Sequence, residues 1–217
     1  MSDSLFQLEK VGFQANGNQI LQDISFTVNK GEVIVFSGPS GSGKSTLLKL
    51  IGTLLSPTSG KIYYRGMDLQ KIDPVEYRKE VSYFFQNASL FDETVQENLS
   101  FPARIREEGF DRERAKKLLE RVQIPETYLS KEVKELSGGE KQRVALVRNL
   151  MYQPKVLLLD EVTSSLDQEN RAIVLDLVRD MMKDQQTTVL AVTHNQEEID
   201  QASRLITIKG GKMEESK

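Results

Sequence analysis

Cysteine is absent from the 217-residue chain. Disulfides, zinc–thiolate sites and thiol nucleophiles are therefore excluded, and a chain without thiols suits a reducing cytosol. Long apolar runs are also missing, because none exceeds four residues, whereas a membrane-spanning helix needs about 20. The polar start Met1-Ser2-Asp3-Ser4 has neither the basic residues nor the apolar stretch of a signal peptide. We therefore expect a soluble chain that is not exported by itself.

The chain also lacks a large excess of one charge. It has 29 Lys and Arg against 32 Asp and Glu, a formal net charge of −3. Proteins whose main partner is DNA or RNA usually carry a basic patch, and no block of basic residues occurs here. We expect no nucleic-acid partner. The length predicts one large domain or a domain with an inserted subdomain.

Apolar patterning predicts an α/β protein. The first thirty residues alternate apolar and polar side chains, with turn residues at Asn16-Gly17 and Asn29-Lys30-Gly31. They predict an antiparallel hairpin that leads into a third strand. From there on, helical patterns separate segments with the continuously apolar character of a parallel sheet, namely 32–37, 81–85, 156–159 and 188–192. The residues from Gly210 onward are expected to form a frayed tail.

A charged, helix-favouring stretch runs from Asn87 to Glu135, with Asp111 placed to cap a helix through Arg121. We interpret 87–149 as an inserted helical subdomain. The remaining parts, 1–86 and 150–217, would then form a catalytic core with an antiparallel β subdomain.

The segment after the third strand satisfies the pattern G-x-x-x-x-G-K-[ST] of a phosphate-binding loop. Its glycines let consecutive backbone N–H groups turn toward an anion, Lys44 can reach terminal phosphates, and the Ser45 hydroxyl can ligate Mg²⁺. An accidental match in a Gly/Ser-rich loop is the alternative, which the preceding strand and the following helix oppose. The predicted nucleotide-binding residues are Gly38, Pro39, Ser40, Gly41, Ser42, Gly43, Lys44, Ser45 and Thr46.

Two carboxylates, Asp160 and Glu161, end the apolar strand 156–159, where an α/β sheet places its ligand crevice. Asp160 would hold Mg²⁺ through water, and Glu161 would face the attacking water. Taken alone, acids at this place are equally well explained as caps of the next helix. Asp167 would cap a helix that begins at Gln168.

His194 is the single histidine and follows the strand 188–192 directly. It lies at the same edge as the two carboxylates if that strand joins the parallel sheet. A lone surface histidine is usually an ordinary polar side chain. Its place beside the predicted phosphates favours a contact with the terminal phosphate instead.

The segment from Leu136 to Arg143, with Ser137, Gly138 and Gly139, resembles the signature sequence of ATP-binding cassette (ABC) ATPases. Read without the family, it is a helix start with Ser137 as N-cap. With the phosphate loop, Gln86, the two carboxylates and His194 in family order, the resemblance covers nearly the whole chain. It implies a P-loop NTPase (RecA-like) parallel-sheet core, an N-terminal antiparallel β subdomain and an inserted α-helical subdomain.

The resemblance implies a mechanism as well. Two copies dock head to tail, and each ATP lies between the phosphate loop of one copy and the signature residues of the other. ATP binding closes this dimer and hydrolysis opens it. The implied roles are Lys44 and Ser45 on phosphate and Mg²⁺, Gln86 sensing Mg²⁺ and water, Asp160 supporting the metal, Glu161 activating water, His194 clamping the γ-phosphate, and Ser137 and Gly139 acting in trans.

The resemblance further implies a separate membrane permease that docks on the insert near 87–95, which would place the chain in the cytoplasm at the inner face of the cell membrane. The alternative is an amphipathic helical layer without a partner. Within the family, the segments 56–60, 90–102 and 136–149 are most similar to the FetA-type ATPases associated with iron export.

One departure concerns adenine, because Ala15 stands where many relatives have a stacking aromatic residue. Either the platform is missing or Phe13 serves from a shifted loop.

Two other classes of protein share some of these motifs. A chromosome-maintenance ATPase would need long coiled coils between the phosphate loop and the signature, and sustained heptads are absent. A cassette that binds ATP without turnover would not need intact Glu161, Gln86 and His194.

Overall fold

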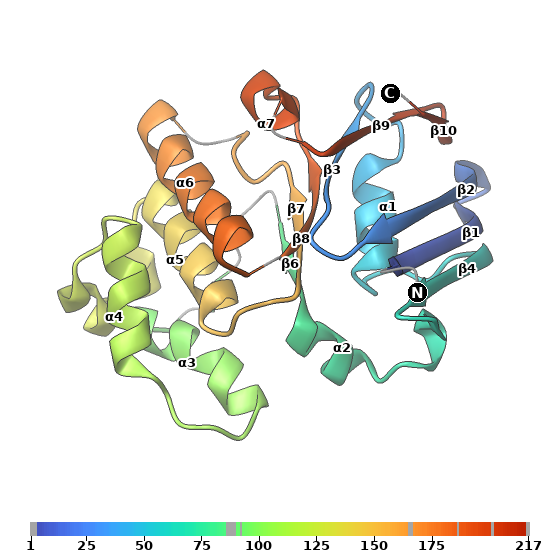
Figure 1. Ribbon diagram of the computed structural model, residues 1–217. Coiled ribbons are helices and arrows are strands. Elements are labelled where there is room, and N and C mark those ends of the chain that lie inside the picture. The colour runs from blue at the N-terminus through green and yellow to red at the C-terminus, as the bar shows by residue number, and fades with distance from the viewer. Residues whose placement is uncertain are drawn as a thin grey trace. The chain divides into compact units, whose positions relative to one another are not determined.

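The computed structural model describes residues 4–85, 90–91, 93–164, 167–185, 187–200 and 202–215. The described chain forms two compact units, 1–83 with 155–161 and 185–217, and 84–154 with 162–184. The first unit is the β-rich part and the second is helical (Figure 1). The strands are β1 Ser4–Ala15, β2 Asn18–Asn29, β3 Val33–Ser37, β4 Ser59–Tyr64, β5 Met67–Asp68, β6 Val81–Phe84, β7 Val156–Asp160, β8 Thr188–Val192, β9 Arg204–Lys209 and β10 Lys212–Glu215. The α-helices are α1 Lys44–Ile51, α2 Pro74–Glu80, α3 Val95–Ile105, α4 Arg112–Arg121, α5 Gly138–Leu150, α6 Gln168–Gln185 and α7 Gln196–Asp200.

An antiparallel sheet with the strand order β2-β1-β4-β5 begins the first unit. Ala15 lies opposite Asn18 in the β1–β2 ladder, so the turn consists of Asn16 and Gly17, whose φ angles are 51° and 78°. Two consecutive positive φ angles are what a tight hairpin turn requires, and an Asn-Gly pair supplies them at low cost. The predicted hairpin is confirmed, and β4 and β5 extend it beyond the prediction.

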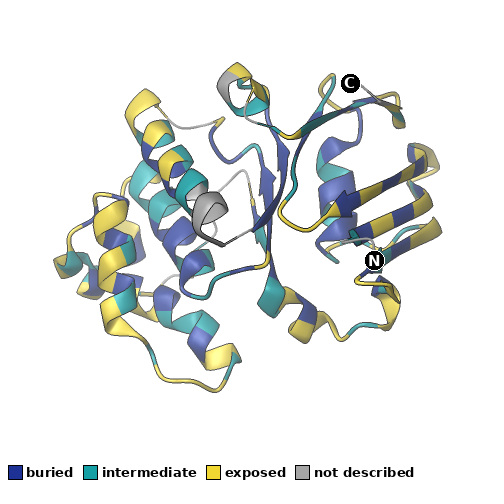
Figure 2. Ribbon diagram, viewed as in Figure 1, coloured by how far each residue is buried: buried dark blue, intermediate teal, exposed yellow. Residues whose placement is uncertain are grey.

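The second sheet has the order β10-β9-β3-β8-β7-β6. β3 pairs in parallel with β8 and β9, and β7 pairs in parallel with β8. Every residue of β7 and β8 is buried, which explains their unbroken apolar runs, and both strands are dark blue in Figure 2. The parallel core and its four predicted strands are confirmed.

The C-terminal residues form a hairpin, so the expected frayed tail is wrong for the described residues up to 215. Gly210 and Gly211 turn the chain with φ angles of 53° and 75°, and β10 pairs antiparallel with β9. The Gly211 carbonyl accepts a hydrogen bond from Gln22 N at 2.8 Å. A Cβ at Gly211 would lie 2.4 Å from the Ile20 carbonyl oxygen, so a side chain there would break this docking onto β2.

The second unit is built on helices with clear start signals. The Asp111 side chain accepts from Arg114 N at 2.9 Å at the start of α4, which confirms the predicted helix from Asp111 to Arg121. Thr94 and Glu97 form a capping box at the start of α3. Asn98 of α3 is fully buried and bonds both backbone groups of Phe91, so the segment before α3 is tied to the helix.

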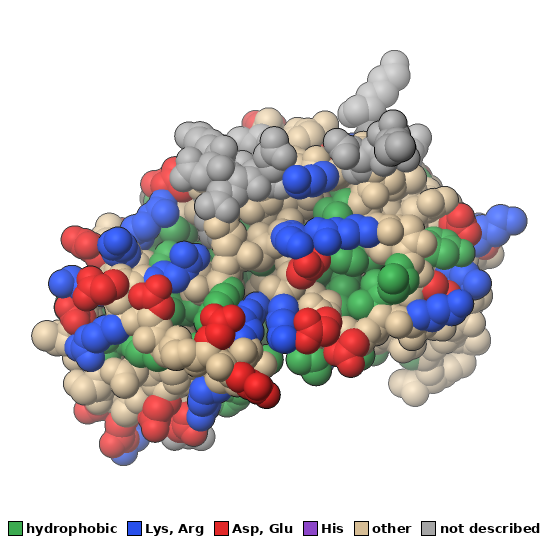
Figure 3. Space-filling model, turned by 60° about the horizontal axis from the view of Figure 1, so that its bottom comes forward, with side chains coloured by type: hydrophobic (Ala, Val, Ile, Leu, Met, Phe, Trp, Pro, Cys, Tyr) green, Lys and Arg blue, Asp and Glu red, His purple; other side chains and the backbone are tan. Residues whose placement is uncertain are grey.

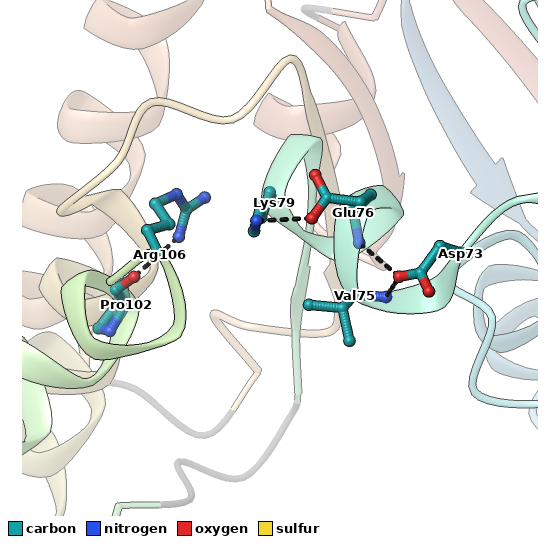
Figure 4. A network of polar contacts seen from close by, with 6 residues as sticks. All are labelled: Asp73, Val75, Glu76, Lys79, Pro102 and Arg106. Carbon is teal, nitrogen blue, oxygen red and sulfur yellow. Dashed lines mark hydrogen bonds and ion pairs between the residues drawn. The ribbon is translucent and has the colours of Figure 1, made fainter. Parts of the chain in front are cut away.

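Local contacts fix two surface helices, one in each unit (Figure 4). In the first unit the Asp73 side chain caps α2 by accepting from backbone N–H groups, including Glu76 N at 3.1 Å. Lys79 forms an ion pair with Glu76 one turn along the same helix. In the second unit Arg106 donates to the Pro102 carbonyl at 3.1 Å, which gives an extra partner to the end of α3.

Among the described residues, no helix combines the length and the apolar character needed to cross a membrane. On the face in Figure 3, acidic and basic side chains are interspersed, with apolar side chains between them. The expected lack of a nucleic-acid partner stays a prediction.

Candidate functional site

The phosphate loop joins β3 to α1 in the first unit. Gly38 and Gly43 have φ angles of 130° and 105°, in a region that only glycine adopts readily. A Cβ would lie 2.0 Å from the Ile208 carbonyl oxygen at Gly38 and 2.6 Å from Leu21 Cδ2 at Gly43. The loop is therefore pressed onto β9 and β2. Because α1 begins at Lys44, its unpaired first-turn N–H groups are available to an anion.

Two buried polar side chains in this loop suit a phosphate. Lys44 is 3% exposed and donates to the carbonyls of Gly38 and Pro39, both at 2.8 Å. Burial lowers the pKa of the Lys44 ammonium, while the nearby carboxylates Glu161 and Asp160 oppose that shift. The Ser42 hydroxyl is buried and has no hydrogen-bond partner within the described part of the chain. Since buried hydroxyls are normally paired, this oxygen fits a site completed by a ligand.

Asp160, the last residue of β7, is 7% exposed and reaches the start of α1. Its Oδ1 accepts from Ser45 Oγ at 2.6 Å, and its Oδ2 accepts from the Tyr83 hydroxyl at 2.7 Å. Burial, together with the hydrogen bond to Asp160, raises the pKa of Tyr83 above its usual value. The phenol is therefore protonated and is the donor. Tyr83 could not be predicted from the sequence, because a tyrosine in a strand carries no motif.

Glu161 follows Asp160 in a left-handed backbone conformation with φ 50°. Such a conformation costs energy in residues other than glycine and is common at functional sites. The Glu161 N–H donates to the Val192 carbonyl at 3.0 Å, which ties it to the end of β8. His194 follows β8, and its Nε2 lies 3.6 Å from Glu161 Oε1. The structure thus places His194 at the same sheet edge as the two carboxylates.

The signature residues lie in the second unit, at the start of α5. Ser137 N donates to Glu140 Oε2 at 2.7 Å, and Glu140 N donates to Ser137 Oγ at 3.3 Å. This capping box confirms Ser137 as the N-cap, and the hydrogen bond from Ser137 N holds the pKa of Glu140 below its usual range. A Cβ at Gly139 would lie 3.1 Å from Asn170 Nδ2, and Asn170 N donates to the capping carboxylate of Asp167 at 2.9 Å.

The structure brings together most of the predicted catalytic and metal-binding residues in the first unit, namely Lys44, Ser45, Asp160, Glu161 and His194. Gln86 lies outside the described residues. For adenine, Phe13 is partly buried against the hydrophobic core and lies opposite Leu21, whereas Ala15 ends the β1 ladder. Whether either side chain meets adenine stays a prediction.

A family model described as ABC transporter matches residues 21–164. The protein named "Probable iron export ATP-binding protein FetA", from Escherichia coli (strain K12), is 45% identical over 215 residues, which cover 98% of this chain and 96% of FetA.

Two solved structures are similar over nearly the whole chain. The first is a dimeric post-hydrolysis state of the ATP-binding cassette MJ0796 bound to ADP and Pi, with a TM-score of 0.85 and 28% identity, covering 97% of this chain and 98% of that one. The second is a bacterial Atm1-family ABC exporter with ATP bound, with a TM-score of 0.87 and 26% identity, covering 99% of this chain and 39% of the exporter chain. The expected P-loop NTPase fold is confirmed. The chain belongs to the ABC transporter family, as one of its ATP-binding and ATP-hydrolysing proteins.

Proposed function

We propose that this chain hydrolyses ATP at the edge of its parallel sheet, with Lys44 and the loop 38–46 on the phosphates, Glu161 on the attacking water and His194 on the γ-phosphate. The clustering of these side chains supports the proposal. A hydroxyl, two carboxylates and an imidazole lie beside Lys44 of the phosphate loop, since Ser45 donates to Asp160 and His194 Nε2 lies 3.6 Å from Glu161 Oε1. Glu161 can accept a proton from water, and His194 can donate a hydrogen bond to a phosphate oxygen.

The residues present also fit Mg²⁺. Ser45 and Asp160 offer oxygen atoms, which Mg²⁺ prefers, and the ion is usually held by one or two protein groups together with substrate phosphates and waters. Gln86 would add an amide oxygen. When bound, Mg²⁺ neutralises charge on the phosphates. Asp160 would hold the ion through water, while Ser45 would contact it directly. The hydrogen bond from Ser45 to Asp160 also joins α1 to β7.

We also propose that two copies close head to tail around two ATP, with Ser137 and Gly139 of one copy completing the site of the other. The capped start of α5 supports this, because a helix N-terminus with two small residues leaves room for an anion. The relative MJ0796 was solved as a dimer with ADP and Pi. Hydrolysis at Glu161 would then open the dimer.

The transport role proposed here is iron export through a separate membrane permease. FetA is described as a probable iron export protein, and the Atm1-family structure is an exporter. The chain would then work in the cytoplasm at the inner face of the cell membrane, with the segment near 87–95 against the permease. Residues 86–89 and 92 of this region lie outside the described part.

Phosphate release by the purified chain tests the enzymatic part. We expect steady release from ATP with Mg²⁺ and none in excess EDTA. Binding of ATP without any release, with or without the permease, would favour a cassette that only binds the nucleotide. For the cargo, we expect cells that produce the permease with the wild-type chain to hold less iron than cells with Glu161→Gln. Equal iron content would contradict iron export.

A further inference from the structure

The two carboxylate oxygens of Asp160 are held by donors from two different elements. Ser45, in the first turn of α1, donates to Oδ1, and Tyr83, in β6, donates to Oδ2. Asp160 itself is 7% exposed. A buried carboxylate with one donor on each oxygen has a fixed orientation, because rotation about its last bond would break both hydrogen bonds.

The two donors differ in what they can do when a nucleotide arrives. Ser45 lies in the first turn of α1 and is itself a proposed Mg²⁺ ligand. Its hydroxyl oxygen would therefore also bind the metal. Tyr83 donates to the other carboxylate oxygen and is not a proposed ligand. Its bond to Oδ2 can therefore persist and keep Oδ1 directed toward Ser45 and the metal position.

The ring of Tyr83 packs closely against the end of α1. A Cβ at Gly52, the residue that ends α1, would lie 2.9 Å from Tyr83 Cδ2 and 3.2 Å from Leu158 Cδ1. Gly52 has a backbone conformation open to any residue, with φ −75°. Glycine is therefore needed here for its lack of a side chain, which leaves room for the Tyr83 ring. The ring lies beside the position that a Gly52 side chain would take, as does Leu158 of β7.

We propose that Tyr83 is a positioning residue for the Mg²⁺ of the ATP site, acting by holding Oδ2 of Asp160 so that Oδ1 faces Ser45 and the metal. The inference rests on the proposed function, because it assumes that Asp160 supports the metal. Residues that orient metal-supporting groups are often needed for full metal affinity, although they do not touch the metal. Nucleotide binding without metal does not use this contact.

The test is a binding cycle that does not depend on turnover. ADP affinity is measured by calorimetry with excess Mg²⁺ and with EDTA, and the ratio of the two affinities reports how strongly the metal and the nucleotide support each other. In Tyr83→Phe we expect this ratio to fall about tenfold, with the affinity in EDTA unchanged.

The matched control is Tyr77→Phe. Tyr77 is 2% exposed, and its hydroxyl donates to the Ile51 carbonyl, also at the end of α1, at 2.6 Å. This change removes a buried hydroxyl from the same unit but leaves Asp160 untouched. We expect Tyr77→Phe to lower the melting temperature and to keep the wild-type affinity ratio.

Gly52→Ala is a second variant that should disturb the Tyr83–Asp160 contact, by changing the packing of the Tyr83 ring. It provides the test if Tyr83→Phe folds poorly. Its added methyl group should displace the Tyr83 ring and lower the ratio, and the double variant should be no worse than Tyr83→Phe alone. If the ADP affinity of the wild type depends on Mg²⁺ but the affinity ratio of Tyr83→Phe stays within twofold of the wild-type ratio, the proposed role of Tyr83 is overturned. The proposed metal site would still stand. A wild-type chain whose ADP affinity ignores Mg²⁺ would overturn the proposed metal site as well.

Discussion

Ser45 Oγ donates a hydrogen bond to Asp160 Oδ1 at 2.6 Å, although the two residues are 115 positions apart in the chain. The bond joins the first turn of α1, which follows the phosphate loop, to the last residue of β7. A phosphate-binding loop and a carboxylate strand that are separate in the sequence therefore form one site. The residues on either side, Lys44 and Glu161, are brought near each other by the same arrangement.

Lys44→Ala should abolish tight MgATP binding and leave the fold intact. Its ammonium supplies a charge that the backbone N–H groups cannot replace, so we expect a loss of about 2 kcal/mol or more of binding free energy. Nucleotide titration measures the loss, and a cooperative melt checks the fold. Lys49→Ala, later in the same helix, is the control and should bind normally. Wild-type affinity in Lys44→Ala would remove this loop from the phosphate site.

Ala15→Tyr should tighten ATP binding by roughly 1 kcal/mol if Ala15 faces adenine, because the ring adds a stacking surface. Phe13 packs against the hydrophobic core, so Phe13→Ala should mainly lower the melting temperature. Titration of ATP into both variants separates the two readings. Unchanged affinity in Ala15→Tyr with weakened affinity in Phe13→Ala would instead make Phe13 the stacking residue.

Glu80 should make folding stability depend on pH. Burial alone would raise its pKa, but hydrogen bonds from Lys155 and Tyr64 and the charge of Arg65 outweigh burial and lower the pKa below 4.5. A lowered folded-state pKa means that the stabilisation is complete above the unfolded-state value and is lost as the pH falls through the folded-state value. The Lys155 ammonium forms an ion pair with this carboxylate.

Denaturant unfolding of the wild type and Glu80→Gln at several pH values measures this effect. We expect the free energy of unfolding of the wild type to exceed that of the variant at pH 7. The difference should shrink as the pH falls below about 4.5, the ordinary value for a glutamate. A difference that stays constant from pH 7 to about pH 3 would contradict the role of this carboxylate.

Local signals predicted much of the fold. The Asn16-Gly17 turn and the helix capped by Asp111 depend on a few neighbouring residues, so the sequence is enough to find them. Gly210-Gly211 suggested a tail because two glycines favour both loose chain and tight turns. The carbonyl of Gly211 accepts a hydrogen bond from Gln22 of β2. This long-range contact stabilises the turn, and no local sequence pattern reveals it.

The candidate site was predictable where residues belong to motifs and not where they act through distant contacts. The phosphate loop and the two carboxylates could be found because their residue types follow from phosphate and metal chemistry. Tyr83 lies 77 positions from Asp160 and could not be found. Glu140 closes the capping box with Ser137, and the signature resemblance alone did not indicate that role.

Glu161→Gln should trap a dimer. The change keeps the size of the side chain and removes its ability to accept a proton, so bound ATP should persist and hold two copies together. In size-exclusion chromatography the variant should elute as a dimer with MgATP and as a monomer with ADP. Ser137→Arg in addition should abolish the dimer, because a bulky side chain would block the contact at the start of α5. A dimer that survives this second change would contradict the contact in trans.

Steady-state phosphate release by Glu161→Gln tests the central claim most directly, because that claim assigns activation of water to the Glu161 carboxylate. Wild type and variant are compared at saturating MgATP, after binding assays show that both hold the nucleotide. General-base catalysis typically contributes 10²- to 10⁴-fold, so we predict turnover at least about 100-fold below wild type. Undiminished phosphate release by Glu161→Gln would contradict the claim and remove Glu161 from the catalytic role.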